Sequence, residues 1–146
     1  MATFSRTATT DWSGSNMEGK GQVKAGTGAF TLPVTFPARI GEPGGHTSPE
    51  ELIAASHAAC YAMALNATLG RRGGSAEKTD VTATVTADKG DSGIKITTSK
   101  LTVVAHGLTG IEKDQFGEVA RAAEQGCPVS NALRGSLNID LDARAE

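Results

Sequence analysis

A long apolar run in the middle of the chain constrains the fold more than any other feature. No residue from Leu52 to Gly70 carries a formal charge. A helix start comes just before it, since Ser48 suits an N-cap, Pro49 suits the first helical position and Glu51 stands three residues after the cap. The run ends in the glycines and arginines of residues 70–74, which favour a helix C-terminus. At about 1.5 Å per residue, the run predicts a helix roughly 28 Å long.

A helix of this length is also long enough to cross a membrane. However, Ser56, His57 and Asn66 interrupt the run, and alanine, its commonest residue, is a poor lipid anchor. A helix that is apolar on nearly all faces is otherwise a core helix. We therefore expect a long central buried helix and no membrane partner.

Alternating and glycine-punctuated segments on both sides of this helix predict strands. The expected strands cover residues 2–12, 22–25, 29–35, 80–88, 93–106 and 136–141, and two further helices cover residues 111–125 and 127–133. Strand–helix–strand alternation is rare in this order, which favours an α+β fold with antiparallel sheets over a doubly wound α/β fold. The length of 146 residues predicts a single domain, residues 1–146.

The composition argues against a nucleic-acid partner and in favour of an oligomer. Lys and Arg number 14 against 16 Asp and Glu, a net charge of −2, whereas nucleic-acid binders usually carry a basic surplus. Leu, Ile, Val and Phe together number only 27, beside 22 alanines. Because an alanine buries little apolar surface, one chain alone would have a thin core. We therefore expect no nucleic-acid partner and an obligate oligomer whose chains share a core.

The N-terminal segment and the cysteine count bear on location. Residues 1–12 contain no basic stretch followed by an apolar one, so we expect no targeting segment and predict a cytoplasmic protein. The cytoplasm is reducing. The two cysteines are therefore expected to be reactive, metal-binding or inert rather than joined in a structural disulfide.

The two cysteines occupy different local settings. Cys60 lies in the middle of the expected helix, where it is either a small core residue or a nucleophile. A mid-helix thiol gains nothing from the helix N-terminus, so it needs a cation from elsewhere to lower its pKa from about 8.5. Cys127, between Gly126 and Pro128, lies at an expected N-cap, where helix amides stabilise a thiolate or a small residue simply fills the cap. A thiol on a rigid helix and one at a glycine junction suit an attacking and a resolving cysteine.

A metal site is an alternative use of the same cysteines. His57 and Cys60 share one helix face, and Cys127 could supply a third ligand. No paired C-x-x-C or H-x-x-x-H spacing supports zinc, and a core or interface histidine is the other interpretation of His57. The missing C-x-x-C also excludes a thioredoxin-type motif.

Two charged residues near the helix start are further candidates. Arg39 precedes a glycine-rich loop, where most arginines are simply solvated. Glu51 already fits a capping box, which leaves Glu50 without a local task beyond that of a favourable carboxylate in the first turn.

The motifs around the cysteines resemble a known family. Residues 47–65, TSPEELIAASHAACYAMAL, and residues 126–133, GCPVSNAL, resemble the OsmC branch of the OsmC/Ohr family of thiol-dependent peroxidases, as does FPARIGEPGG upstream. The resemblance covers essentially the whole chain. It implies an α+β fold built as an intertwined homodimer with active sites at the interface. It also implies reduction of organic hydroperoxides without a metal, haem or flavin cofactor, and regeneration by an external dithiol of lipoyl type.

The resemblance assigns a role to each of the four candidates. Cys60 matches the peroxidatic cysteine, Cys127 the resolving cysteine, Arg39 the activating arginine and Glu50 its carboxylate partner. Lowering a thiol pKa by about 2 units takes about 2.7 kcal/mol, which a close cation with a hydrogen bond can supply. A partly buried arginine in turn needs a counter-charge, which Glu50 would provide.

The surroundings of the thiol bear on the substrate. Leu52, Ala58, Ala59 and Met63 are expected to form an apolar pocket near Cys60, which favours organic hydroperoxides over hydrogen peroxide. Tyr61 stands where a phenylalanine is common in the family. We expect this difference to change the polarity of the pocket and to leave the thiol chemistry intact.

The spacing of Glu50 and Cys60 predicts a site shared between subunits. Ten residues on one helix span about 15 Å, so we expect Arg39 and Glu50 to act on Cys60 of the partner subunit. Two other functions stay open from the residues alone. One is a dimeric binding module that holds an apolar ligand and has inert cysteines, and the other is a metal-dependent hydrolase.

Overall fold

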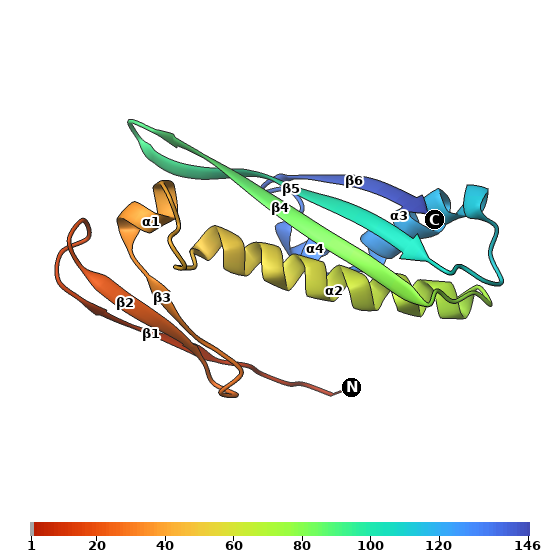
Figure 1. Ribbon diagram of the computed structural model, residues 1–146, viewed down its shortest axis with the longest axis horizontal. Helices are drawn as coiled ribbons and strands as arrows, with labels where there is room; N and C mark the ends of the chain where they lie inside the picture. The colour runs from red at the N-terminus through yellow and green to blue at the C-terminus, as the bar shows by residue number, and fades with distance from the viewer. Residues whose placement is uncertain (1) are drawn as a thin grey trace. The chain divides into compact units, whose positions relative to one another are not determined.

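The computed structural model describes residues 2–146 and divides the chain into two compact units, with the boundary between Leu52 and Ile53. Figure 1 shows the elements of both units. The expectation of one domain over residues 1–146 stays a prediction, and Met1 lies outside the described residues.

The first unit is built on a small antiparallel sheet in the order β1-β2-β3. Its strands are β1 (Ala8–Ser13), β2 (Lys20–Ala25) and β3 (Thr31–Val34). The expected strand over residues 2–12 is shortened at its start, because β2 pairs only with Ala8–Ser13. At Gly21, which pairs with Trp12, a Cβ would lie 2.8 Å from the indole ring, so only glycine fits beneath it.

A short helix, α1 (Phe36–Ile40), follows the sheet and was not predicted. Thr35 is its N-cap, and its Oγ1 accepts a hydrogen bond of 3.2 Å from the N–H of Ala38. Pro37 is compatible with the first turn, because N–H groups at this position have no acceptor within a helix and proline lacks an N–H. Because five residues are too few to produce a helical periodicity in the sequence, α1 was not predicted.

The long predicted helix is α2 (Pro49–Arg71), and its start is confirmed. The N–H of Glu51 donates to Ser48 Oγ over 3.1 Å, as an N-cap requires. By length and composition, α2 is the one helix of residues 2–146 that could cross a membrane, yet one of its faces lies in the protein core. The buried residues of α2 recur every three or four positions: His57, Tyr61, Leu65, Thr68 and Leu69.

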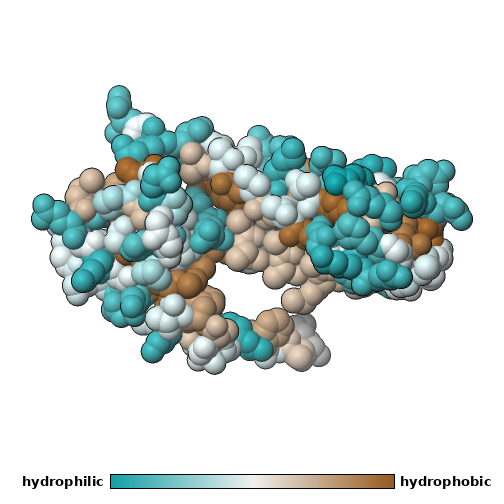
Figure 2. All heavy atoms as spheres, in the orientation of Figure 1, coloured by the Kyte–Doolittle hydropathy of each residue, from teal (hydrophilic) through white to brown (hydrophobic). Residues whose placement is uncertain are grey.

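The expectation that α2 is a central buried helix needs correction. Met63 is 72% exposed, and Ala55, Ser56 and Ala59 are exposed as well. Figure 2 shows apolar residues at the surface in the region where α2 runs in Figure 1. The physical reason is that the sheet and helices of the second unit provide packing partners for only one face of α2.

The second unit contains a three-stranded sheet in the order β4-β5-β6. Its strands are β4 (Lys78–Gly90), β5 (Gly93–His106) and β6 (Asn138–Ala145). The β4–β5 hairpin is antiparallel as predicted, but β6 pairs with β5 in parallel. The expectation of purely antiparallel sheets fails at this pair, because two helices intervene and return the chain to the same edge in the same direction.

Two helices connect β5 to β6. They are α3 (Phe116–Gly126) and α4 (Pro128–Leu133), preceded by a 3-10 turn over Lys113–Gln115 that replaces the start of the helix expected over residues 111–125. The core lies between α2, α3 and β5 and consists of Tyr61, Leu65, Leu69, Leu101, Val103, Ala105, Phe116, Val119, Ala120, Ala123 and Cys127. The α+β class is confirmed, and the core places Cys127 beside the middle of α2.

Candidate active site

Arg39 and Glu50 form an ion pair in the first unit. Arg39 Nη2 donates to Glu50 Oε1 over 2.7 Å, and Arg39 Nε lies 3.1 Å from each carboxylate oxygen. The side chains are 28% and 14% exposed, respectively. This fork geometry fixes the plane of the guanidinium as well as its position.

Local structure explains why these two residues meet. Arg39 lies in the last turn of α1 and Glu50 in the first turn of α2. The loop between them is tied to the sheet by the N–H of Thr47, which donates to the carbonyl of Pro33 over 2.9 Å. Glu51 is held by the Thr47 hydroxyl over 2.7 Å, so Glu50 is the acidic residue left to face Arg39.

The pair is charged at neutral pH. The hydrogen bond from Arg39 lowers the pKa of Glu50, and the same bond raises the pKa of Arg39. Among the hydrogen bonds of residues 2–146, those of Arg39 use Nε and Nη2 and leave Nη1 unused. Arg39 therefore keeps N–H donors on Nη1 that an anion could use.

An apolar cavity of about 260 Å³ lies beside Arg39 within the first unit. Its apolar lining includes Trp12, Val23, Val34, Phe36 and Leu52. Leu52 was one of four residues expected to line an apolar pocket near Cys60, but the cavity it lines here does not include Cys60. The other three, Ala58, Ala59 and Met63, belong to the second unit.

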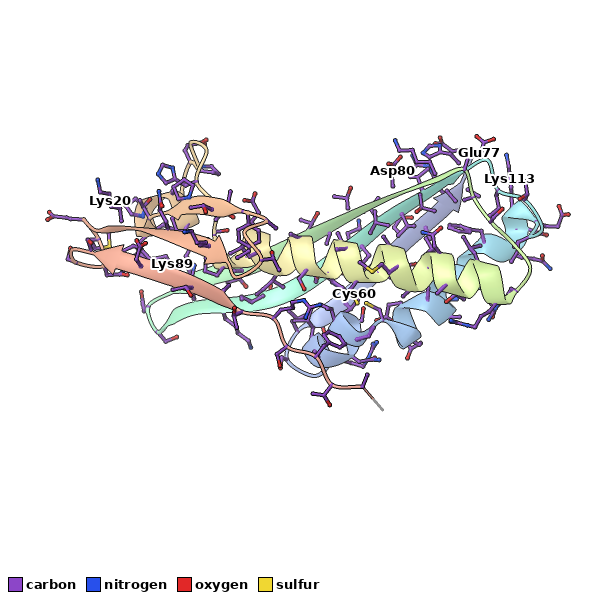
Figure 3. The ribbon with its side chains drawn as sticks, turned by 90° about the horizontal axis from the view of Figure 1, so that it is seen from below. Lys20, Cys60, Glu77, Asp80, Lys89 and Lys113 are labelled. Atoms are coloured by element: carbon purple, nitrogen blue, oxygen red, sulfur yellow. The ribbon has the colours of Figure 1, made fainter. Side chains whose placement is uncertain are left out.

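Cys60 and Cys127 come together in the second unit, and both are free thiols. Cys60 is half-buried near the middle of α2 (Figure 3), whereas Cys127 is fully buried. Burial raises the pKa of the Cys60 thiol, the backbone N–H of Val129 lowers it, and the adjoining thiol of Cys127 raises it. Within the described second unit, no cationic side chain contributes to this pKa. A cation that lowers the pKa of Cys60 would have to come from outside the described second unit.

Cys127 is the N-cap of α4, as predicted. Its Sγ accepts a hydrogen bond of 3.5 Å from the N–H of Ser130, three residues further on. Pro128 begins the helix, so the chain turns sharply at the sulfur.

His57 is completely buried one turn before Cys60. Its Nδ1 lies 2.7 Å from Ser99 Oγ on β5, and its Nε2 lies 2.7 Å from Ser130 Oγ on α4. Both ring nitrogens are thus engaged, which contradicts the metal interpretation of His57. In residues 2–146, no group of three or more His, Cys, Asp or Glu side chains is placed to hold a metal.

Two polar contacts of residues near the thiols were not predicted from the sequence. Glu124 is 7% exposed, and its Oε1 pairs with Arg134 Nη2 over 2.7 Å. Tyr61 is completely buried, and its hydroxyl donates to the carbonyl of Ala120 over 2.9 Å. Because this hydroxyl is used within the core, the expected change in pocket polarity at Tyr61 is not supported.

Comparison with known proteins identifies relatives along nearly the whole chain. The model of the OsmC-like protein family matches residues 41–142. Peroxiredoxin OsmC of Escherichia coli (strain K12) is 39% identical over 137 residues, which cover 92% of this chain and 93% of the relative. Organic hydroperoxide resistance protein-like 2 of Staphylococcus epidermidis is 29% identical and covers 86% of this chain and 88% of its own.

The fold comparison agrees with the sequence comparison. The crystal structure of the organic hydroperoxide resistance protein OsmC from Legionella pneumophila matches with a TM-score of 0.77 at 27% identity, covering 99% of both chains. The names of these relatives confirm the predicted class of enzyme, a peroxidase. Because the family model matches residues 41–142 and a relative is 39% identical over 92% of this chain, the chain belongs to the OsmC-like protein family.

Proposed function

We propose that this protein is a thiol-dependent peroxidase that reduces organic hydroperoxides to alcohols through Cys60 and Cys127. The observation that carries the proposal is the contact between the two free thiols, one on the long helix α2 and one at the N-cap of α4. The relatives named for organic hydroperoxide resistance support the substrate class. No metal, haem or flavin is needed for this chemistry.

The reaction has two steps that balance. The Cys60 thiolate attacks the distal peroxide oxygen, the O–O bond breaks, and the alkoxide leaves as an alcohol after taking a proton. The sulfenic acid on Cys60 then condenses with the Cys127 thiol, forming the disulfide and releasing water. An external dithiol, which we expect to be of lipoyl type, reduces the disulfide by exchange.

In this proposal Arg39 supplies the activating cation, and Glu50 is its carboxylate partner. Arg39 has an unused Nη1 edge, and the hydrogen-bonded Glu50 holds its guanidinium in place. A guanidinium beside Cys60 favours the thiolate over the thiol and offsets the effect of burial. The same edge can hydrogen-bond the peroxide oxygens as the O–O bond lengthens.

We propose that this cation acts across a homodimer. Glu50 and Cys60 stand ten residues apart on α2, which is about 15 Å along a helix axis. The exposed small residues on α2, together with Met63, offer a face for a second copy. Each site would then combine the cysteines of one subunit with Arg39 and Glu50 of the other.

The cavity beside Arg39 supports an apolar substrate. Its volume of about 260 Å³ is slightly below the roughly 300 Å³ of the smallest common ligand pockets. An alkyl or aryl hydroperoxide gains free energy when its apolar group enters such a cavity, whereas hydrogen peroxide has no apolar group to bury.

Steady-state turnover with matched peroxides tests the proposal. The reduced protein is given cumene hydroperoxide or hydrogen peroxide with dihydrolipoamide as the reductant, in the wild type and in Cys60→Ser and Cys127→Ser. We expect cumene hydroperoxide to be preferred and both variants to lose turnover. If Cys60→Ser keeps the wild-type rate, the proposal is wrong, and a binding module for an apolar ligand in the cavity becomes the better explanation.

Mixed dimers test the shared site. A heterodimer of a Cys60→Ser chain with an Arg39→Ala chain has one intact site and one doubly altered site if the sites are shared. We expect it to keep about half of the wild-type activity, since one of two sites is intact. An inactive heterodimer would show that Arg39 acts within its own chain. The predicted cytoplasmic location can be checked separately by cell fractionation.

A further inference from the structure

A buried imidazole links the two helices that carry the cysteines. His57 on α2 contacts Ser99 Oγ and Ser130 Oγ, both over 2.7 Å, and all three residues are completely buried. Burial lowers the pKa of His57, which favours the neutral ring, while the nearby Glu124 raises it. A neutral ring has one donor and one acceptor nitrogen, and serine hydroxyls can complement either.

Ser130 makes a second contact that concerns the reaction. Its N–H donates to Cys127 Sγ over 3.5 Å, while its hydroxyl contacts His57 Nε2. The residue whose N–H donates to the Cys127 sulfur is therefore also the residue whose hydroxyl contacts the imidazole. Since α4 has only six residues, a fixed point at Ser130 sets the direction of its first turn.

The resolving step has strict geometric requirements. A disulfide needs sulfurs about 2.05 Å apart and a dihedral angle near 90°. Attack by Cys127 on the Cys60 sulfenic acid must therefore start from a narrow range of sulfur positions. Holding the reacting groups in such a range increases the reaction rate by orders of magnitude.

We propose that His57 is a positioning residue for the resolving step, and that it acts through Ser130 to hold the Cys127 sulfur against Cys60. This inference rests on the proposed peroxidase function. His57 touches neither the peroxide nor the reacting sulfurs in this role. The bond to Ser99 anchors the ring to β5, and the bond to Ser130 carries the effect to Cys127.

The two serines provide a matched pair of variants. Ser99→Ala and Ser130→Ala each remove one hydroxyl from the same imidazole, from equally buried positions. A purely structural role of the histidine predicts similar effects of both. The proposal predicts that Ser130→Ala alone slows disulfide formation, by about tenfold or about 1.4 kcal/mol of activation free energy.

Two variants of the histidine separate its nitrogens. The terminal nitrogen of a glutamine occupies a position near that of imidazole Nε2, and that of an asparagine lies near Nδ1. His57→Gln can thus keep the contact to Ser130, and His57→Asn can keep only the contact to Ser99. We expect His57→Asn to behave like Ser130→Ala and His57→Gln to restore most of the rate.

Single-turnover kinetics read out the two steps separately. One equivalent of cumene hydroperoxide is added to reduced protein, and peroxide loss, trapped Cys60 sulfenic acid and disulfide are measured by quenching and intact mass. We expect peroxide loss within about twofold of wild type in all four variants, while sulfenic acid accumulates in Ser130→Ala and His57→Asn alone. Thermal unfolding shows whether each variant folds. If a histidine variant does not fold, the comparison of Ser99→Ala with Ser130→Ala is sufficient to test the proposal.

Each other result counts against the inference. Equal slowing in Ser99→Ala and Ser130→Ala, or an unchanged disulfide rate in Ser130→Ala, overturns the role of His57 while leaving the peroxidase proposal intact. Failure of the wild type to consume peroxide overturns both proposals.

Discussion

Replacing Arg39 by alanine should remove the thiolate from Cys60 at neutral pH. A thiol with the ordinary pKa of about 8.5 is only about 3% ionised at pH 7. Burial raises the pKa of Cys60 further, so its thiolate fraction without a cation falls below that figure. If wild-type Cys60 is more than half ionised, Arg39→Ala lowers the rate of peroxide reduction at pH 7 by at least about fifteenfold.

The pH dependence distinguishes thiol activation from other roles of Arg39. In Arg39→Ala the rate should rise about tenfold per pH unit until the pH passes the raised pKa of Cys60, whereas the wild-type rate should level off near neutral pH. Single-turnover reduction of cumene hydroperoxide from about pH 6 to pH 9.5 measures this directly. Arg39→Lys should lie between the two, because it keeps the charge and loses the fork to Glu50.

Arg72→Ala is the matched control for this experiment. Arg72 also forms an ion pair with a glutamate, Glu118, but on the surface, so its removal should leave the rate and the pH profile unchanged. An Arg39→Ala protein with the wild-type rate at pH 7 would refute the reasoning. A loss of rate that high pH does not restore would show that Arg39 acts on the peroxide or on folding rather than on the thiol.

Two further predictions concern stability. The pKa of Glu50 is lowered by Arg39, so its stabilising effect is present above the ordinary value of about 4.3 and is lost as pH falls through the lowered value. Glu50→Gln should therefore reduce the free energy of unfolding by about 1–2 kcal/mol at pH 7, and urea titrations should show this gap closing in acid; a gap independent of pH would contradict the charge argument. Tyr61→Phe removes the donor to the Ala120 carbonyl and should cost about 1 kcal/mol in the same assay while peroxide reduction is unchanged. A change in substrate preference in that variant would instead place the hydroxyl at the substrate pocket.

Features encoded by neighbouring residues were predictable from the sequence. The start of α2 follows from Ser48 and Pro49, and the N-cap at Cys127 follows from Pro128 and the preceding glycine. In each case the deciding interactions lie within one turn of helix, so the local sequence contains all the information required. The Glu51 side chain was expected to complete a capping box, and in the structure its carboxylate instead accepts from the Thr47 hydroxyl.

Features that depend on the path of the chain were not predictable in this way. The parallel pairing of β6 with β5 follows from where α3 and α4 return the chain. His57 meets partners 42 and 73 positions away in the sequence, and no local pattern marks Ser99 or Ser130. Its position three residues before Cys60 suggested a metal ligand, and only the tertiary contacts show that both nitrogens are in use.

The oxidation state of the two cysteines after one turnover tests the central claim most directly. Fully reduced protein is treated with one equivalent of an organic hydroperoxide and examined by intact mass, thiol count and peptide mapping. The account predicts loss of two hydrogens, no free thiols and a peptide linked through Cys60 and Cys127. Two unchanged thiols with the peroxide still intact would contradict it.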